Sequence, residues 1–271
     1  MEKVKELFTI QKELSQMKNS LGYKIYNNSI SGFSSKKLFN SFLKVLKFCD
    51  RGKNFKNYNK LKNWQSSDLH EKLISMRKSN KHDFALIYDV MQKNNSINEF
   101  CISNNLKSLA EKFLGAKNGE MMMRSQIRMD VPKDNRNTFG WHQDSAYDKL
   151  NLNPKNGVVL WIPLLDAEID KGALEVKPKS QSEGNTYIVK KKYKKFQSPQ
   201  LIVPDKALAK YKTAKVPVKK NQCLALFGNV FHKSGNNISN KIRFTIIARF
   251  NKILTKDFYI YNKTKIFDEL Y

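Results

Sequence analysis

The stretch GWHQDSAYD, residues 140–148, sets His142 and Asp144 two positions apart between a tryptophan and a tyrosine. On an extended chain, side chains at this spacing lie on the same face, so an imidazole and a carboxylate can converge on one point. The same short pattern also arises by chance, at a strand edge with one polar face. A metal site therefore requires a third ligand from elsewhere in the chain.

A third ligand is offered by His232, in the stretch NVFHKSGN. Of the other histidines, His70 and His82 lie in the half of the chain expected to be helical. Two imidazoles and one carboxylate are the donor set that holds Fe(II) on one face. A structural zinc site would need a fourth protein ligand, normally a cysteine. Cys223 is the candidate, but its place in the apolar run CLALF favours a core residue.

A cation suited to a dicarboxylate follows on the next predicted strand, IRFTIIARF, residues 242–250. The guanidinium fork of Arg243 matches a carboxylate bidentately. Strand alternation places Arg249 on the same face as Arg243. Burying an arginine is costly unless it is paired, so the alternative is an edge strand whose arginine faces water. Ser234, two positions after His232, would add a hydroxyl to the same carboxylate.

The elements that must position these residues change character halfway along the chain. Helical periodicity of apolar residues occurs near residues 4–17, 38–46, 67–78, 82–92 and 106–114. Ser34 or Ser35 is placed to cap the second of these helices, and Gly115 to end the last. From Glu120 onward, short runs rich in β-branched and aromatic residues predict strands.

The connections between the predicted strands contain no helix-length periodic segment, which favours antiparallel sheets or a barrel over a parallel sheet. We therefore expect an α+β fold in one domain, residues 1–271, with 1–118 mainly helical and 119–262 forming a β core. A lysine-rich insertion at 190–213 interrupts this core. It is either a solvated loop or a mobile flap that meets an anionic substrate.

The composition sets the broad class. The formal net charge of +26 comes mostly from lysine, in a chain also rich in Asn, Ile, Phe and Tyr. That balance is typical of an A/T-rich coding sequence, although an anionic small molecule or a nucleic acid would also be attracted. The charged N-terminal segment and the absence of a long apolar run predict a soluble, cytoplasmic protein. The three scattered cysteines indicate reduced thiols, not a disulfide framework.

Three segments, taken together, resemble the phytanoyl-CoA dioxygenase family of Fe(II)/2-oxoglutarate oxygenases. They are WHQD at 141–144, VVLWIPLLDAEIDKGALEVKPKSQSEG at 158–184 and FGNVFHKSGNNISNKIRFTIIARF at 227–250. The resemblance extends over about residues 120–252. It departs at 178–181, where PKSQ stands in place of the Pro-Gly-Ser-His often found in the family, which affects the expected shape of the substrate mouth.

The resemblance implies a double-stranded β-helix, or jelly-roll, with flanking helices. It implies Fe(II) bound by His142, Asp144 and His232, with 2-oxoglutarate and O2 as cosubstrates. It further implies that four residues contact 2-oxoglutarate: Arg243, Ser234, Trp161 and Gln126. Tyr147 is either a packing aromatic or part of the substrate wall, and Arg249 would hold an acidic substrate group or pair with a carboxylate.

The implied reaction is hydroxylation of a C–H bond in a small molecule, for which an anionic substrate is one candidate, with release of succinate and CO2. Halogenating relatives replace the aspartate by a small residue, so Asp144 favours hydroxylation. The pair Arg243 and Arg249 is reminiscent of alkylation-repair dioxygenases that act on nucleic acid, but the spacing of the ligands disfavours this alternative. A non-catalytic jelly-roll binding module is the other alternative, disfavoured because every ligand is present. No membrane partner is expected.

Overall fold

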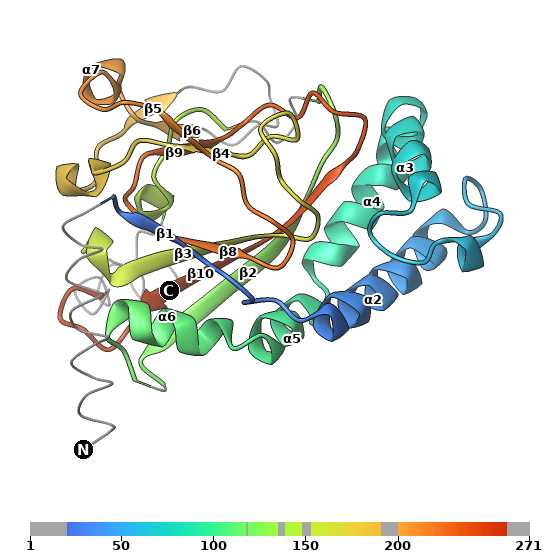
Figure 1. Cartoon of the computed structure of the whole chain (residues 1–271), viewed down its shortest axis with the longest axis horizontal. Coiled ribbons are helices and arrows are strands. Elements are labelled where there is room, and N and C mark those ends of the chain that lie inside the picture. Colours follow the sequence, from blue (N-terminus) through green and yellow to red (C-terminus); the bar gives the residue numbers. More distant parts are fainter. Residues whose placement is uncertain (1–20, 118, 135–138, 148–152, 191–199, 259–271) are drawn as a thin grey trace, which may run out of the picture.

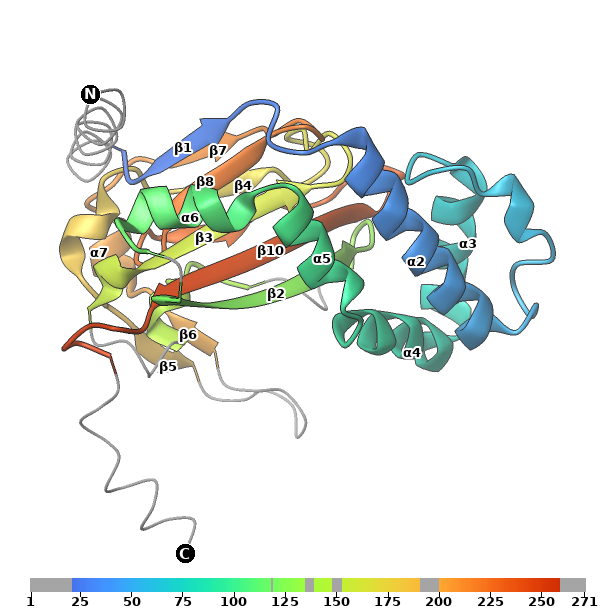
Figure 2. The same cartoon turned by 90° about the horizontal axis from the view of Figure 1, so that it is seen from below.

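The computed structural model describes residues 21–117, 119–134, 139–147, 153–190 and 200–258. Two antiparallel sheets lie one above the other, and helices from the first half of the chain cover the outer face of the larger sheet (Figures 1 and 2). The predicted mixture of N-terminal helices and C-terminal antiparallel strands is therefore confirmed. The helix predicted near residues 4–17 lies outside the described residues.

The helices of the first half follow the predicted periodicity closely. They are α2 (Gly32–Asp50), α3 (Ser67–Ser79), α4 (Lys81–Gln92), α5 (Ser96–Ser103) and α6 (Leu106–Leu114). Gly115 ends α6 in the left-handed conformation, as predicted. The N-cap of α2 is Ser31, not Ser34 or Ser35 as predicted. The Ser31 hydroxyl accepts the Ser34 N–H at 3.0 Å, so the helix begins earlier than predicted. Helix α5 was missed because eight residues are too few to display a clear period.

The larger sheet has the strand order β1-β8-β3-β10-β2. Its members are β1 (Tyr23–Tyr26), β8 (Cys223–Phe227), β3 (Gly157–Pro163), β10 (Arg243–Lys252) and β2 (Met121–Asp130). Strand β10 pairs with β2 on one side and β3 on the other, so Arg243 does not lie on an edge strand. Strand β1 was not predicted, and it brings part of the expected helical segment 1–118 into the sheet.

The smaller sheet consists of β7 (Ala214–Val216), β4 (Leu174–Val176) and β9 (His232–Ser234). A separate hairpin of β5 (Ile188–Lys190) and β6 (Gln200–Ile202) precedes the short helix α7 (Asp205–Leu208). The hairpin and α7 occupy much of the predicted insertion at 190–213. Residues 191–199, which hold half of its lysines, lie outside the described residues, so the flap remains a prediction.

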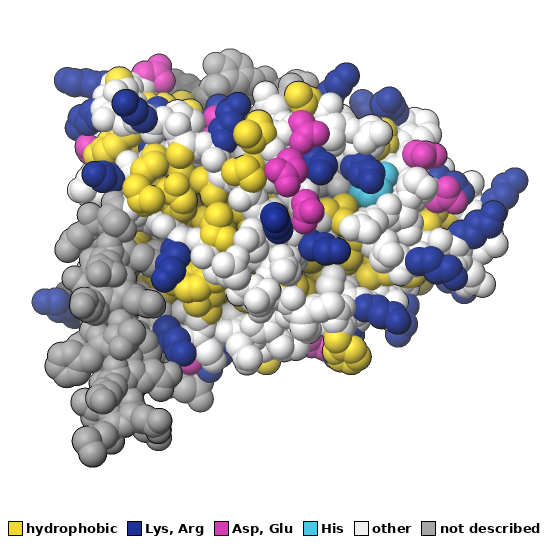
Figure 3. Space-filling model, viewed as in Figure 1, with side chains coloured by type: hydrophobic (Ala, Val, Ile, Leu, Met, Phe, Trp, Pro, Cys, Tyr) yellow, Lys and Arg dark blue, Asp and Glu magenta, His cyan; other side chains and the backbone are white. Residues whose placement is uncertain are grey.

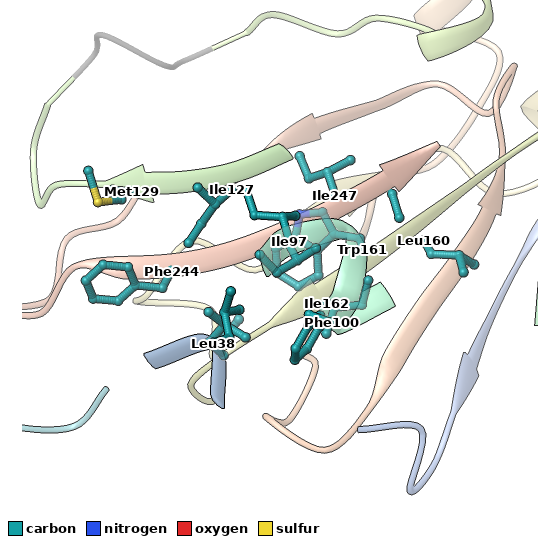
Figure 4. Close-up of a cluster of buried hydrophobic side chains, with 14 of the residues drawn as sticks. Leu38, Ile97, Phe100, Ile127, Met129, Leu160, Trp161, Ile162, Phe244 and Ile247 are labelled. Carbon is teal, nitrogen blue, oxygen red and sulfur yellow. The ribbon is translucent and has the colours of Figure 1, made fainter. Parts of the chain in front are cut away.

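The outer face of the larger sheet packs against the helices. Leu38 of α2 and Ile97 and Phe100 of α5 lie against apolar side chains of β2, β3 and β10 (Figure 4). The ring of Phe244 in β10 is centred 5.8 Å from that of Phe42 in α2. Burial of large aromatic side chains at this interface holds the helical layer against the sheet.

The inner face of the larger sheet is polar along β2 and β10. Residues directly opposite each other in an antiparallel pair project to the same side. The register pairs Arg243 with Asp130, Thr245 with Arg128, Ile247 with Gln126, and Arg249 with Arg124. Arg243 and Arg249 thus share one face, as predicted, and this face looks toward the smaller sheet (Figure 1).

On the face seen in Figure 3, the positive charge has no single focus. Figure 3 shows lysine and arginine side chains dispersed over the face in view, with several acidic side chains between them. Among the described residues, none of the helices has the length and apolar character needed to cross a membrane.

Candidate metal centre

His142 and His232 are held together by backbone pairing. They form an isolated antiparallel bridge in which each N–H donates to the other's carbonyl at 3.0 Å. His232 begins β9, and His142 extends the smaller sheet by this one bridge. The two imidazole rings are centred 4.3 Å apart, and both side chains are buried. Residues 90 positions apart in the sequence are therefore brought side by side by main-chain hydrogen bonds.

Asp144 completes the cluster from a turn. The extended geometry assumed for the His142–Asp144 spacing holds only in part, because Asp144 begins a 3-10 helix, η3 (Asp144–Tyr147). Its Oδ1 lies 3.9 Å from His142 Nε2, and its Oδ2 lies 3.8 Å from His232 Nε2. Two ligand atoms on one ion can be separated by at most about 4.4 Å, twice a bond of about 2.2 Å. Both separations, which use different oxygens of the carboxylate, fall within this limit. With one ligand atom taken from each residue, the three atoms lie within 4.8 Å of one another, a grouping that could hold a metal ion.

Both imidazoles present the correct nitrogen to the centre of the cluster. His142 Nδ1 lies 2.8 Å from the carbonyl oxygen of Gly140, and His232 Nδ1 lies 2.8 Å from that of Val230. A carbonyl only accepts, so each Nδ1 carries the proton and each neutral ring keeps a lone pair on Nε2. This is the usual arrangement of metal-binding histidines, whose outer nitrogen is oriented by a hydrogen bond.

The protonation states of the cluster also suit a metal. Burial and the neighbouring His232 lower the pKa of His142 to about 3. Burial likewise lowers the pKa of His232. Burial acts to raise the pKa of Asp144, but the charge of Arg249 and the two imidazoles outweigh it and hold the pKa below its usual value. At neutral pH the cluster therefore offers two neutral imidazoles and a carboxylate, the forms that coordinate cations.

Two further side chains hold the cluster from outside. Arg249 Nη2 donates to Asp144 Oδ1 at 3.1 Å, so the carboxylate partner named as one alternative for Arg249 is Asp144. Gln143 lies between the ligands and is buried. Its amide donates to the carbonyls of Gly184 and Asn229 and accepts the N–H of Thr186. Sequence reasoning missed Gln143, because a glutamine between two ligands carries no chemical signal of its own.

Arg243 and Ser234 lie together at one end of the inner face, where both line a cavity of about 230 Å³. Arg243 is buried and not free: Nη2 donates to Asp130 Oδ2 at 2.7 Å, and Nη1 donates to the carbonyl of Gly172. Its guanidinium carbon lies 5.8 Å from the centre of the Trp161 ring. Asp130 also accepts a bond from Arg128. Asp130 was not predicted from the sequence, and its ion pair with Arg243 offsets the cost of burying the guanidinium.

The middle of the inner face contains an unsatisfied polar atom. Among the described residues, Thr245 Oγ1 is buried and has no hydrogen-bond partner. Gln126 lies opposite Ile247, the next inward residue of β10, and Ile247 lies opposite Trp161. An orphaned hydroxyl beside a half-buried amide fits a site that receives a polar ligand. Gln126 and Trp161 therefore share the inner face with Thr245 and Arg243.

Aromatic rings flank His142 on two sides. The ring of Tyr147 is centred 6.3 Å away and that of Phe139 5.5 Å away. The Tyr147 hydroxyl accepts the N–H of Leu201 at 2.8 Å, so Tyr147 connects the cluster to the β5–β6 hairpin. Phe139 was not singled out in the sequence, although it lies in the same stretch as His142.

Cys223 takes no part in the cluster. It begins β8 in the larger sheet, opposite Tyr26, and is buried. Burial raises the pKa of its thiol far above the usual value. Among the described residues, the group that could hold a metal consists of His142, Asp144 and His232. The assignment of Cys223 to the core is thus consistent with its position.

Comparison with known proteins agrees with this arrangement. The model of the phytanoyl-CoA dioxygenase (PhyH) family matches residues 36–245, which include the three clustered residues and Arg243. A search of curated proteins found no match to this chain.

Solved structures of similar fold include proteins described as non-heme enzymes. The non-heme monooxygenase ThoJ is 13% identical and covers 89% of this chain and 78% of its own, with a TM-score of 0.56. The epimerase SnoN, in complex with Fe3+, α-ketoglutarate and nogalamycin RO, is 11% identical and covers 90% and 84%, with a TM-score of 0.53. EvdO2 from Micromonospora carbonacea var. aurantiaca, complexed with 2-oxoglutarate, is 15% identical and covers 89% and 90%, with a TM-score of 0.51.

At these identities the solved structures establish the fold alone, whereas the family match extends over most of the chain. The buried cluster of two imidazoles and a carboxylate is the donor set that the chemistry of this family requires. The chain belongs to the phytanoyl-CoA dioxygenase (PhyH) family and is an oxygenase-type enzyme dependent on iron and 2-oxoglutarate.

Proposed function

We propose that this protein hydroxylates a C–H bond of a small molecule, using O2 and converting 2-oxoglutarate to succinate and CO2. One oxygen atom of O2 would enter the succinate and the other the substrate hydroxyl. The observation that carries the proposal is the buried cluster of His142, Asp144 and His232, with both Nε2 atoms and a carboxylate directed to one point. Ferrous iron bound there would supply the activation of O2.

The chain's own residues would bind and orient the cosubstrate. Arg243 and Ser234 line one cavity, and we assign them to the far carboxylate of 2-oxoglutarate. Because Asp130 already pairs with Arg243, this carboxylate must share the guanidinium or displace part of that contact. Trp161 and Gln126, on the same inner face, would line the path between Arg243 and the cluster. Thr245 Oγ1 is the buried polar atom that a bound ligand could satisfy.

The two-sheet arrangement supports a jelly-roll interpretation. The smaller sheet runs β7-β4-β9 and is extended by the His142–His232 bridge, while the larger sheet presents its polar face toward it. A pair of sheets with strands exchanged between them leaves a protected interior, from which bulk water is largely excluded. Tyr147 and Phe139 would form part of the wall on the substrate side.

Metal binding and succinate release together test this proposal. The full chain should bind Ni(II), a redox-inert substitute, and should release succinate when given Fe(II), 2-oxoglutarate and O2. His232→Ala should abolish both, because two remaining ligands cannot hold the ion on one face. Arg243→Ala should weaken 2-oxoglutarate binding about 10- to 100-fold while Ni(II) still binds, since it removes charge-assisted hydrogen bonds.

The substrate class is tested in the same assay. Pools of small metabolites should stimulate succinate release above the substrate-free rate, whereas alkylated single-stranded DNA should not. Wild-type protein that binds neither Ni(II) nor 2-oxoglutarate would favour a non-catalytic binding module and refute the proposal.

A further inference from the structure

Two arginines face each other at the Asp144 end of the inner face. Arg249 in β10 lies directly opposite Arg124 in β2. In an antiparallel pair, side chains in this relation start about 5 Å apart and project to the same side. Like charges placed this way destabilise a sheet. A position that costs stability in this manner is a candidate for function.

The two arginines have too little negative charge around them. Arg249 donates to Asp144, and the structure gives its guanidinium no other hydrogen bond or ion pair among the described residues. Arg124 is exposed, and its guanidinium has no hydrogen bond or ion pair with any of the residues that the structure describes. Two positive charges are thus offset by one carboxylate. Because Asp144 belongs to the metal centre, a bound cation would reduce that compensation further.

Both arginines open onto the same space. Together with Asp144, Ser145 and Gly228 they line a narrow crevice of about 10 Å³. This volume holds a single water-sized group. A ligand can therefore place only one atom there, such as a single oxygen of an anionic group, while the rest of that group lies at the mouth of the crevice.

We propose that Arg124 and Arg249 bind an oxyanion carried by the substrate, such as a carboxylate or a phosphate. This inference rests on the proposed function and names the substrate class: a small molecule with an anionic end group. Guanidinium forks match the paired oxygens of such groups and hold them at fixed orientation. Binding at the edge of Asp144 would fix the substrate relative to the metal.

The anion in question is not the far carboxylate of 2-oxoglutarate. That carboxylate is assigned to Arg243, six residues before Arg249 on the same strand. At about 3.3 Å per residue, the two Cα atoms are separated by roughly 20 Å. The strand therefore offers two cationic positions, one at each end of the inner face.

Sulfate binding tests the proposal directly. Sulfate is chosen as the probe because it resembles the expected oxyanion and is a poor metal ligand. The full chain, loaded with Ni(II) and 2-oxoglutarate, is titrated calorimetrically with sulfate at constant ionic strength. Arg124→Gln should weaken sulfate binding about tenfold, the effect of one lost charge-assisted contact.

Lys252→Gln is the matched control, because it removes one positive charge from the same end of β10. Its side chain donates to the carbonyl of Gly115, away from the crevice. The control should change sulfate affinity less than about twofold, as expected for a screened distant charge. Equal weakening by both variants would mean that only the overall positive field attracts sulfate, and would overturn the proposal.

Thermal unfolding without sulfate gives a second readout. Arg124→Gln should leave the Tm unchanged or raise it, since a repulsive cross-strand pair is removed. A clearly lower Tm with unaltered sulfate affinity would assign Arg124 a purely structural role and refute the inference. If Arg124→Gln weakens 2-oxoglutarate binding but leaves sulfate binding unaltered, the arginine pair serves the cosubstrate. This outcome would also refute the inference.

The sulfate titration is repeated on metal-free protein, so that it remains informative if Ni(II) and 2-oxoglutarate fail to bind. In that case the proposed function is wrong, and the arginine pair is judged on its own. If Ni(II) and 2-oxoglutarate bind but Arg124→Gln leaves sulfate affinity intact, the proposed function stands and the arginine inference fails.

Discussion

Replacement of Gln143 by leucine would test what holds the two ligands of the WHQD stretch in place. The Gln143 amide donates to the carbonyl of Gly184 at 2.5 Å and to that of Asn229 at 2.8 Å. It accepts the N–H of Thr186 at 2.7 Å. The side chain is only 1% exposed, so water does not replace these bonds easily. Leucine has a similar size and removes all three.

The expected loss of stability follows from these three bonds. A buried hydrogen bond contributes about 1 kcal/mol net, so Gln143→Leu should cost about 3 kcal/mol. The cost rises if the two carbonyls and the N–H remain buried without partners, at up to about 3 kcal/mol for each. Domains of this kind are stable by about 5–15 kcal/mol. At the expected cost of about 3 kcal/mol, the variant should therefore fold, with a markedly reduced margin.

The metal centre should weaken as well. His142 and Asp144 flank Gln143, and Asn229 lies in the turn that leads to His232, so the lost contacts join the two halves of the site. Loss of supporting hydrogen bonds of this kind typically reduces metal affinity about 10- to 100-fold.

Urea unfolding with and without Ni(II), together with Ni(II) titration, measures both effects. Gln65→Leu is the matched control, since Gln65 is exposed and lies in the helical half of the chain. The reasoning is refuted if Gln143→Leu unfolds within about 1 kcal/mol of the wild type and binds Ni(II) equally well.

Three other residues give predictions from their contacts. His70 accepts the Ile242 N–H through Nδ1, and burial lowers its pKa from 6.5 to about 4. In this pH range the unfolded chain binds a proton that the folded chain does not, so the free energy of unfolding should fall by about 3 kcal/mol between pH 6.5 and 4. Urea unfolding across this range should show the loss, and the loss should be smaller in His70→Gln. Tyr147→Phe removes the acceptor for the Leu201 N–H, so hydrogen exchange at Leu201 should accelerate while global stability changes by about 1 kcal/mol or less. Asp130→Asn leaves the Arg243 guanidinium buried without its counter-charge, and should lower the free energy of unfolding by about 3–5 kcal/mol in urea titrations.

The parts of the structure that follow from local pattern were predictable. Except at its last residue, strand β10 has only apolar residues on its outer face, whereas Arg243, Thr245 and Arg249 alternate with them on the inner face, so the face assignment for the two arginines could be read from the sequence. Helices α3, α4 and α6 display enough turns for their period to be recognised. The clustered ligands were predictable because histidines are rare in this chain and the donor set is chemically restrictive.

The parts that depend on distant contacts were not predictable. Strand β1 has four half-buried residues, and it becomes a strand only because β8 offers a free edge. Asp130 ends β2 with no sign in the sequence that Arg243 is its partner. Asp144 leaves the extended conformation for a 3-10 turn, so its carboxylate reaches the imidazoles by a path that strand alternation does not describe.

The orientation of the two histidines explains why the neighbouring backbone matters so much. Each Nδ1 proton is donated to the carbonyl two residues earlier, at Gly140 or Val230, so the segment that carries each imidazole also orients it. The same two segments are joined by the His142–His232 bridge. No single side chain therefore fixes the imidazoles, and their geometry should respond mainly to changes that shift one segment against the other. Gln143 spans the two segments through Asn229, which is why a neutral amide should influence metal affinity more than its chemistry alone would indicate.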